Sequence, residues 1–241
     1  MTVHVINLDR DPERLARFHR LNAHLPEVIR LPAVDGKTLD RRELEAKGTI
    51  TAGLQFSDGS LGCGLSHMTL WRQAIQEQKP ITVAEDDAVF APDFIASSHA
   101  LLETLRPDWD IVLWGWNFDA LLWAEIPEGV SACRIEFNQS HLRQNIEVFR
   151  TRKYGHTLLR LRHAFGNLCY SVSPAGARTL LDNCLPLSNR TVEFPGYGVK
   201  LENKTFDSTM NRVYPRLKAY ACMPPLAVSE NRHETSNTRR G

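Results

Sequence analysis

The first part of the chain alternates between a strand-like and a helix-like pattern of hydrophobic positions. Residues 3–8 form an apolar, β-branched run of the kind found in buried strands. Apolar side chains then recur at roughly helical spacing over residues 15–25, behind Asp11, which can cap a helix, and Pro12, which suits its first position. These patterns predict that the chain opens with a β-α unit.

The rest of the chain repeats this alternation, apart from one long segment. Residues 48–64 contain five glycines and are predicted to be a loose segment before a helix that starts at Leu65. Residues 117–165 carry no assignable pattern. Strands are predicted over residues 28–34, 81–84, 110–114, 167–172 and 217–222. Helices are predicted over residues 40–47, 65–79, 92–105 and 173–183, with a further short helix capped by Asp207.

Composition and charge exclude several classes of protein. Of the 241 residues, 42% are hydrophobic and 24% are charged, so the chain is neither disordered nor fibrous and is long enough for one sizeable core. The formal net charge is +1 and the pI is about 7.7, so no global field favours nucleic acid as a partner. Basic residues over 150–163 interleave with leucines, which indicates the polar face of an ordinary element.

The cysteines and the N-terminus bear on the cellular compartment. The five cysteines are scattered and form no C-x-x-C pair, so we expect reduced and mostly buried thiols. The first residues carry polar and acidic side chains where a signal peptide would be basic and then apolar. No uncharged apolar run approaches the roughly 20 residues that cross a bilayer. We therefore expect a cytoplasmic protein, soluble or peripheral to a membrane.

Three consecutive carboxylates, Glu85, Asp86 and Asp87, directly follow the predicted strand over 81–84. Adjacent like charges raise one another's pKa unless a positive group neutralises them, and Mg²⁺ or Mn²⁺ prefers such oxygen ligands. Ligands of open α/β sheets gather at the carboxyl ends of strands, where this triplet lies. The triplet therefore predicts a divalent metal site. The alternative is a solvated acidic turn in which Asp86 or Asp87 caps a helix.

Two further segments carry candidate ligand-binding residues. The glycines of residues 62–67 precede a predicted helix and could let backbone amides approach a phosphate or a sugar. Asn7, Arg10 and Arg14 lie just past the first strand, where an arginine could bind a diphosphate with two hydrogen bonds. The alternatives are a flexible helix entry with a packed His67 in the first segment and a solvated helix face in the second.

The order and spacing of these motifs are similar to those of glycosyltransferase family 25, which includes bacterial lipopolysaccharide galactosyltransferases and collagen galactosyltransferases. The matching residues are INLDR at 6–10 with Arg14, AVDG at 33–36, GCGLSH at 62–67 and EDD at 85–87. The resemblance covers most of the chain and is densest over residues 3–90.

This resemblance implies a fold, a donor and a cofactor. The expected fold is an α/β, GT-A-like, Rossmann-type nucleotide-sugar-binding domain with a mixed central sheet flanked by helices. A single domain over 1–228 would have a donor-binding half (1–115) and an acceptor half (116–228), followed by a polar tail over 229–241 that we expect to be mobile. A UDP-sugar, often UDP-galactose, would bind with Mn²⁺ or Mg²⁺ on the triplet. The expected donor-site residues are Asn7, Arg10, Arg14, Asp35, Gly36, Gly62, Gly64, Ser66 and His67.

The resemblance also implies inversion at the anomeric carbon, which needs a carboxylate base on the face of the sugar opposite the leaving group. The family places an acid at Asp207, although this chain has Thr205-Phe206 where the family usually has Pro-Val. The other candidates are Asp119, just past a predicted strand, and Glu193, in a segment rich in Pro and Gly. Against Asp207 stands the interpretation that it only caps a helix.

The predicted function is metal-dependent, inverting transfer of a hexose from a UDP-sugar to a glycan, and galactose is the favoured hexose. The expected acceptor is a glycan such as a lipopolysaccharide or capsule oligosaccharide. Two alternatives use the same residues. A metal-dependent phosphohydrolase or nucleotidyltransferase would cleave the donor within its diphosphate. A non-catalytic module would bind a nucleotide sugar or glycan without turnover. The sequence names neither the acceptor nor the hexose, because these choices depend on a few hydroxyl contacts in loops.

Overall fold

The computed structural model describes residues 1–105 and 107–231. Its first half contains all the strands and helices that the hydrophobic pattern predicts there. The β-α unit consists of β1 (Val3–Asn7) and α1 (Pro12–Leu21). The elements that follow are β2 (Val28–Pro32), the 3-10 helix η1 (Gly36–Thr38), α2 (Arg41–Ala46), α3 (Asp58–Glu77), β3 (Ile81–Glu85), β4 (Val89–Phe90), α4 (Phe94–Thr104) and β5 (Ile111–Gly115).

The segment without an assignable pattern forms regular structure in the second half. Its elements are β6 (Leu122–Glu125), β7 (Ala132–Ile135), α5 (Gln139–Gln144), α6 (Ile146–Thr151) and β8 (Thr157–His163). The chain continues with β9 (Cys169–Val172), α7 (Pro174–Cys184), β10 (Val192–Phe194), β11 (Val199–Leu201), α8 (Phe206–Val213), the 3-10 helix η2 (Tyr214–Arg216), β12 (Ala219–Met223) and β13 (Ala227–Val228).

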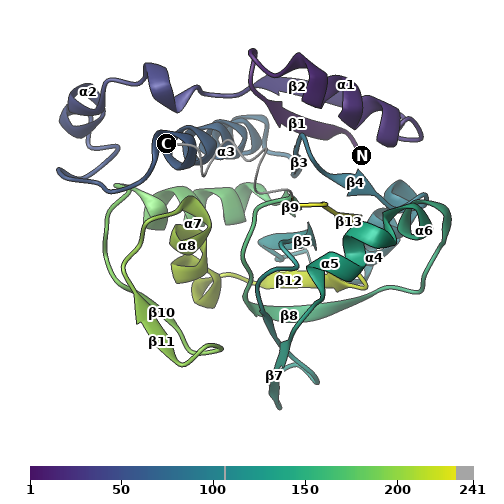
Figure 1. The fold of residues 1–241 in the computed structure, drawn as a ribbon. Coiled ribbons are helices and arrows are strands. Elements are labelled where there is room, and N and C mark those ends of the chain that lie inside the picture. Colours follow the sequence, from purple (N-terminus) through teal and green to yellow (C-terminus); the bar gives the residue numbers. More distant parts are fainter. Residues whose placement is uncertain (106, 232–241) are drawn as a thin grey trace.

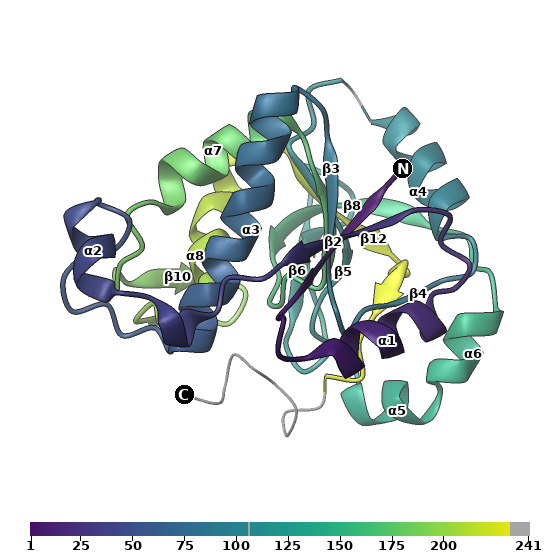
Figure 2. The same ribbon diagram turned by 90° about the horizontal axis from the view of Figure 1, so that it is seen from above.

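Nine of these strands form one mixed sheet in the order β2-β1-β3-β9-β5-β12-β8-β6-β7. β1 pairs in parallel with β2 and β3, whereas β9 runs antiparallel between β3 and β5. Helices cover both faces of the sheet (Figure 1), and the view from above shows the resulting three layers (Figure 2). A mixed sheet flanked by helices confirms the predicted fold class. Strands from both predicted halves share this sheet, because β9 lies between β3 and β5.

Each face of the sheet has its own hydrophobic core. On one face, strand side chains pack with Trp71 of α3, Leu180 of α7 and Met210 of α8, all fully buried. On the other face they pack with Phe18 of α1 and Phe94 of α4. Figure 2 shows α3, α7 and α8 on one side of the sheet and α1 and α4 on the other. The central strands are therefore packed on both faces, which holds the residues that follow β1 and β3 in place.

The order of the first strands creates a crevice at the carboxyl end of the sheet. From β1 the chain passes to β2 on one side and returns to β3 on the other side of β1. Loops that leave two neighbouring parallel strands in opposite directions leave a crevice between them, which is the usual ligand site of open α/β sheets. Asn7 ends β1 and Glu85 ends β3, so both side chains lie at this crevice.

Two predictions about residue chemistry are confirmed by the fold. In β8 the side chains alternate, with Leu161 and His163 buried and Arg160 and Arg162 partly exposed, so this part of the basic stretch is the polar face of a strand. All five cysteines are free, three of them buried and two of them partly buried.

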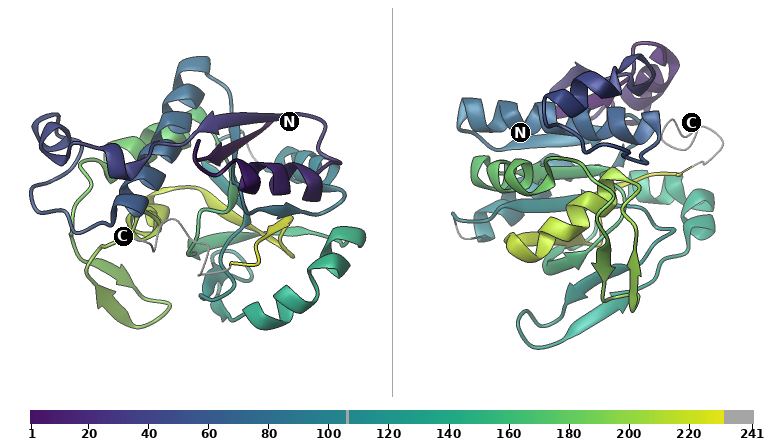
Figure 3. Two further views of the ribbon diagram at one scale, coloured as in Figure 1. Left: turned by 45° about the horizontal axis from the view of Figure 1, so that its top comes forward. Right: turned by 90° about the vertical axis from the view of Figure 1, so that its left-hand side faces the viewer.

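The second half also contributes two antiparallel hairpins, one of which is the edge of the nine-stranded sheet. Strands β10 and β11 pair antiparallel with each other, as do β6 and β7. Arg134 of β7 donates a hydrogen bond to the Gly196 carbonyl at 3.2 Å, so the two hairpins contact each other (Figure 3). Neither hairpin was predicted, because their strands are short and carry many exposed positions.

Candidate active site

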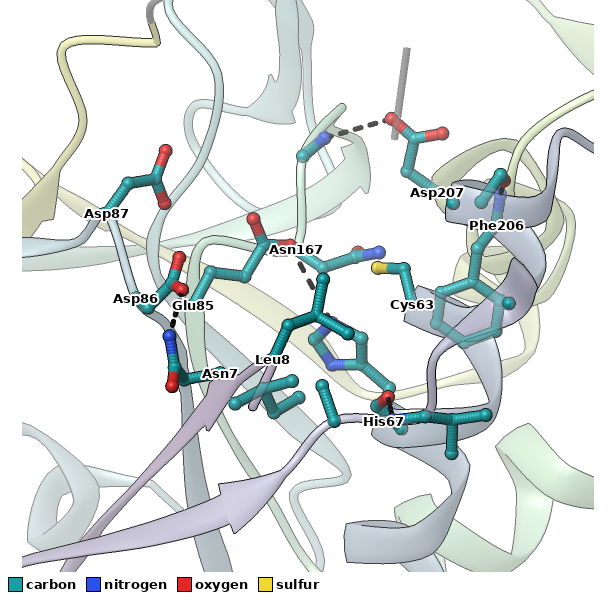
Figure 4. Close-up of a pocket in the computed structure, with 18 of the residues that line it drawn as sticks. Asn7, Leu8, Cys63, His67, Glu85, Asp86, Asp87, Asn167, Phe206 and Asp207 are labelled. Atoms are coloured by element: carbon teal, nitrogen blue, oxygen red, sulfur yellow. Dashed lines mark hydrogen bonds and ion pairs between the residues drawn. The ribbon is translucent and has the colours of Figure 1, made fainter. Parts of the chain in front are cut away.

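A cavity of about 270 Å³ lies at the carboxyl ends of β1 and β3, at the crevice that the strand order creates. Its walls come from both strand ends, the N-terminal part of α3, the start of α8 and the turn before β9. Most of the predicted site residues line this cavity: Asn7, Arg10, Arg14, Asp35, Gly36, Ser66, His67, Glu85, Asp86, Asp87 and Asp207. Residues far apart in the sequence are thus brought to one place (Figure 4).

The three carboxylates of the acidic triplet have different surroundings. Asp86 is 8% exposed and accepts hydrogen bonds from Asn7 Nδ2 at 2.7 Å and from Arg14 Nε at 2.8 Å. A second guanidinium nitrogen of Arg14 also contacts Asp86. The charge of Asp86 is therefore neutralised within the protein. Asn7 and Arg14, both predicted to bind the donor, hold this carboxylate.

Asp87 is not neutralised in this way. Its Oδ2 accepts a hydrogen bond from Ser229 Oγ at 2.8 Å, but Oδ1 is buried and has no hydrogen-bond partner among residues 1–105 and 107–231. Burial, together with the nearby charge of Glu85, raises the pKa of Asp87 to about 6. A carboxylate with these properties is a good ligand for a hard cation, because the ion supplies the missing partner and the missing charge.

Ser229 is the first residue of the predicted mobile tail, and it is only 4% exposed. It follows β13, which pairs with β4, and its hydroxyl also accepts a hydrogen bond from the Asn231 backbone amide at 2.9 Å. Asn231 lines the cavity as well. The start of the tail is therefore held against the site, and residues 232–241 of the predicted tail lie outside the described residues.

Glu85, the last residue of β3, faces His67 of α3. His67 Nε2 lies 3.6 Å from Glu85 Oε1, and the Glu85 side chain is 34% exposed. The other ring nitrogen of His67, Nδ1, is 2.9 Å from the Tyr170 hydroxyl, which also accepts a hydrogen bond from Trp71 Nε1 at 2.8 Å. A buried polar chain through Trp71 and Tyr170 thus fixes the position of His67.

The segment 62–67 is helical, contrary to the prediction of a turn before a helix. Helix α3 begins at Asp58, seven residues before the expected start, and Ser57 caps it by accepting a hydrogen bond from the Ser60 amide at 3.1 Å. Inside a helix, backbone amides bond to carbonyls four residues earlier and are not available to a phosphate. The prediction of a turn at residues 62–67 is therefore wrong, and the helix leaves these amides no free hydrogen for a phosphate.

The glycines of α3 allow close packing. A Cβ atom at Gly62 would lie 2.7 Å from the Gly36 amide nitrogen, and one at Gly64 would lie 2.7 Å from Phe206 Cδ2. Neither glycine lines the cavity. Ser66 has a similar role, because its hydroxyl accepts a hydrogen bond from the Val34 amide at 2.9 Å and donates one to the Gly62 carbonyl at 2.7 Å. Gly62 and Ser66 thus hold the 33–36 segment against α3, and Gly64 makes room for Phe206.

Arg10 and Asp35 lie on the wall of the cavity and form an ion pair with each other. Asp35 also accepts a hydrogen bond from the Lys37 amide at 3.1 Å, which caps η1. Both side chains are about one-third exposed, with values of 39% for Arg10 and 32% for Asp35. They are therefore open to solvent, and a ligand in the cavity can reach either of them.

Asp207 lies across the cavity from the carboxylates of β3 (Figure 4). The prediction that Asp207 caps the short helix α8 is wrong. Thr205 occupies that position, and Asp207 belongs to the first turn. One carboxylate oxygen of Asp207 accepts a hydrogen bond from the Ser208 amide at 2.8 Å, and the other accepts one from the Gly166 amide at 3.2 Å. The carboxylate is thus oriented toward the turn before β9.

The other two candidate bases lie outside the set of residues that line this cavity. Glu193 is in the β10–β11 hairpin and forms an ion pair with Lys200. Asp119 is an exposed residue between β5 and β6, and its charge contributes to raising the pKa of Tyr197, although burial contributes more. Of the three candidates, Asp207 alone is among the residues lining the cavity in the described parts of the chain.

Sequence reasoning missed several residues that line the cavity, including Cys63, Asn117, Gly166, Asn167 and Thr205. Cys63 lies in the recognised 62–67 segment, and its spacing of four from His67 was a usable signal. Gly166 and Asn167 precede β9, which runs antiparallel to β3, so the start of β9 lies beside the end of β3. That placement requires knowledge of the sheet topology.

The geometry agrees with a comparison against protein families. Residues 1–193 match the family described as "Glycosyltransferase family 25 (LPS biosynthesis protein)". The match covers most of the 241 residues, and the chain belongs to glycosyltransferase family 25.

Curated relatives match over about half of the chain. A "Glycosyltransferase 25 family member" of Drosophila pseudoobscura pseudoobscura is 31% identical over 125 residues, which is 47% of this chain and 20% of the relative. "Procollagen galactosyltransferase 2" of Mus musculus is 31% identical over 126 residues, 47% of this chain and 20% of the relative. "Probable inactive glycosyltransferase 25 family member 3" of Rattus norvegicus is 30% identical over 126 residues, 47% of this chain and 22% of the relative.

The match therefore spans about one fifth of the length of these relatives. In the described part of the chain, no helix is both long enough and apolar enough to cross a bilayer.

Proposed function

We propose that this chain is a metal-dependent, inverting glycosyltransferase that moves a hexose from a UDP-sugar to a hydroxyl of a glycan acceptor. Family membership supports glycosyl transfer, and galactose is favoured because relatives are named galactosyltransferases. The family description, which names lipopolysaccharide biosynthesis, favours a lipopolysaccharide oligosaccharide as the acceptor, and a capsule oligosaccharide offers the same kind of hydroxyl. Such a substrate would bring the enzyme to the cytoplasmic face of the inner membrane.

The observation that carries this proposal is the placement of Glu85 and Asp87 opposite Asp207 around one cavity. Inverting transfer needs two functions at a distance from each other: charge neutralisation at the departing diphosphate and a base near the acceptor hydroxyl. The β3 carboxylates and Asp207 come from separate elements and approach the cavity from different sides (Figure 4). A sugar held between them would have its leaving group on one side and the acceptor on the other.

The residues at the end of β3 fit a hard divalent cation. Asp87 offers a buried oxygen without a hydrogen-bond partner in the described chain, and Glu85 offers a partly exposed carboxylate. Asp86 is occupied by Arg14 and Asn7, so Asp87 and Glu85 would hold the ion and Asp86 would not. Bound Mn²⁺ or Mg²⁺ would neutralise charge that develops on the diphosphate as it departs.

The remaining residues would bind and orient the substrates. In this proposal Asp207 accepts the proton of the attacking hydroxyl, and the amides of Gly166 and Ser208 hold its carboxylate in place. Arg10 and Asp35, partly exposed on the cavity wall, would contact the diphosphate and the nucleoside hydroxyls respectively. Arg14 keeps Asp86 neutralised, so that two negative charges of the triplet face the cavity and not three.

A panel of nucleotide sugars tests the proposal, with product analysis in the presence of Mn²⁺ and in excess chelator. Release of the nucleoside diphosphate with metal, but not with chelator, and transfer of the sugar to an added glycan support it. Release of the monophosphate would show cleavage within the diphosphate, as a phosphohydrolase performs. Binding without any product would identify a non-catalytic module, a reading favoured by the relative that is named probable inactive.

A further inference from the structure

Three side chains of different chemistry meet at the inner wall of the cavity. Cys63 and His67 lie four residues apart on α3, so their side chains share one face of the helix. Glu85 approaches the same place from the end of β3. One ligand atom from each of the three, a sulfur, a nitrogen and an oxygen, lies within 4.8 Å of the others. Figure 4 shows the three side chains pointing into the same part of the cavity.

The second observation is the state of His67. Its side chain is 0% exposed, and Nε2 has no hydrogen-bond partner among the described residues, although Glu85 Oε1 is only 3.6 Å away. A buried polar nitrogen without a hydrogen-bond partner destabilises the folded protein, and a bound ligand would remove that cost. Nδ1 is fixed by the Tyr170 hydroxyl at 2.9 Å, and metal-binding histidines usually have their second nitrogen held in this manner.

The set of ligand atoms selects a class of ion. Thiolate, imidazole and carboxylate together suit Zn²⁺ and related transition metals, whereas Mg²⁺ and Mn²⁺ prefer oxygen. Ligand atoms around a tetrahedral Zn²⁺ lie roughly 3.3–3.8 Å apart, because each is about 2.0–2.3 Å from the ion. The distance of 3.6 Å between His67 and Glu85 meets this requirement. The Cys63 sulfur lies within 4.8 Å of both of these ligand atoms.

We propose that Cys63, His67 and Glu85 form a binding site for Zn²⁺ or a chemically similar transition-metal ion. This site shares Glu85 with the proposed oxygen site but does not include Asp87. Binding of the ion releases the Cys63 thiol proton to solvent. All three residues line the cavity, so a ligand in the cavity would have access to the ion. Since Glu85 belongs to both groups, an ion held by Cys63 and His67 withdraws Glu85 from the carboxylates at the end of β3.

Co²⁺ is the probe for the first test, because cobalt bound to a thiolate gives a near-ultraviolet charge-transfer band that oxygen ligands do not give. The full chain is stripped of metal and titrated with Co²⁺. We expect the band to saturate at one equivalent and to disappear when Zn²⁺ is added. A Cys63→Ser variant should lose the band. The matched control is Cys133→Ser, which removes the other partly buried cysteine, on β7, and should keep it.

Absence of the band in the wild-type chain, or its persistence in the Cys63→Ser variant, overturns the proposal. The same titration of a His67→Gln variant should show affinity for Co²⁺ lower by at least about tenfold. Unchanged affinity would mean that His67 only positions Glu85, and would also overturn it. None of these measurements depends on glycosyl transfer, so they are independent of the proposed function.

A second measurement uses the wild-type chain alone and covers the case in which a variant does not fold. Iodoacetamide alkylation is followed by mass spectrometry of the peptides that contain Cys63 and Cys133, with and without one equivalent of Zn²⁺. We expect Zn²⁺ to slow alkylation of Cys63 at least about tenfold and to leave Cys133 unchanged. Equal rates at Cys63 with and without Zn²⁺ would contradict the site.

Discussion

The middle of the central strands and the carboxyl end of β3 differ in how fully their buried polar groups are hydrogen-bonded. In the middle, Ser171 Oγ pairs with Thr82 Oγ1 at 2.8 Å and accepts a hydrogen bond from Trp114 Nε1 at 2.8 Å. At the end of β3, the described residues leave Asp87 Oδ1 and His67 Nε2 without partners. The first arrangement stabilises the fold. The second leaves buried polar atoms without partners, and a bound ligand could supply those partners.

This difference indicates that stability and function are separated along the same strands. Buried polar groups with complete hydrogen bonds support a unique core, whereas unsatisfied or like-charged groups destabilise the folded protein and cluster at functional sites. Asp87, with its raised pKa, is of the second kind. Substitutions at the two places should therefore have opposite effects on the free energy of unfolding and on activity, and the predictions below test that contrast.

The largest effect is expected for Asp207→Asn. Loss of the proposed base should lower turnover by roughly 10²–10⁴-fold, while donor affinity and melting temperature stay close to wild type. Steady-state kinetics, nucleotide titration and thermal melts measure the three quantities. Glu193→Gln, in an exposed ion pair outside the cavity, is the matched control and should keep its activity. Full turnover in the Asp207→Asn variant would show that this residue is not the base, and would leave Asp119 as the next candidate to test.

For Asp87→Asn we expect activity to fall by about 10²-fold or more, because one ligand of the proposed metal site is lost. The same change should leave the metal-free protein as stable as wild type or more stable at pH 7, because it removes a buried charge next to Glu85. Kinetics with Mn²⁺ and thermal melts in chelator give the two readings. Asp182→Asn, exposed on α7, is the control and should alter neither. A strong loss of stability in Asp87→Asn would contradict the comparison.

A Gly64→Val substitution should destabilise the fold by about 3 kcal/mol, because the new side chain overlaps Phe206. The Phe206 ring packs against His67 and Trp71, with centroids 5.6 and 5.5 Å away, so it has little room to move. Urea denaturation measures the change. Gly155→Val, at a site with no atom within 4 Å of an added Cβ, should be close to neutral. If the Gly64→Val variant kept normal stability but lost nucleotide binding, Gly64 would instead contact the ligand.

Removal of the Ser171 hydroxyl tests the middle of the sheet. A Ser171→Ala change leaves the buried Trp114 Nε1–H without its acceptor and should lower the free energy of unfolding by about 2 kcal/mol. Turnover per folded molecule should not change, since Ser171 is outside the set of residues that line the cavity. As a control, Ser140→Ala, exposed on α5, should cost below about 0.5 kcal/mol. Equal costs for the two variants would remove the distinction between the strand middle and the surface.

The smallest effect concerns the dependence of stability on pH. Burial, with a smaller contribution from the charge of Arg162, lowers the pKa of His163 from 6.5 to about 4. Between these values the unfolded chain binds more protons than the folded one, so His163 makes the protein less stable as the pH falls from 6.5 toward 4. A His163→Phe variant, which keeps an aromatic ring beside Trp123, should lose less stability than wild type over this window.

Asp87 contributes the opposite slope, because its pKa is raised from 3.8 to about 6. Between these values the folded protein binds more protons, so Asp87 makes the metal-free protein less stable as the pH rises. Denaturation of wild type, His163→Phe and Asp87→Asn in chelator, from pH 4 to pH 7, separates the two contributions. Identical pH profiles for all three proteins would show that neither group titrates differently in the folded state.

The sequence by itself determined the alternation of strands and helices in the first half, because each element there has a continuous apolar pattern that local spacing makes visible. It also determined that Glu85, Asp86 and Asp87 lie at the carboxyl end of a buried strand, and the order of motifs pointed to the right family. The segment 117–165 could not be assigned, because its short strands pair with partners distant in the sequence and expose many side chains.

Tertiary structure alone decided how the candidate site residues divide their roles. The glycines of α3 are present because Phe206 and the 33–36 segment pack against that helix, which no local pattern can show. Asp86 is neutralised and Asp87 is not, although they are neighbours in the chain, because one faces Arg14 and the other faces Ser229. Charge and hydrogen bonding depend on distances of a few ångströms between residues far apart in the sequence, and the sheet order sets those distances.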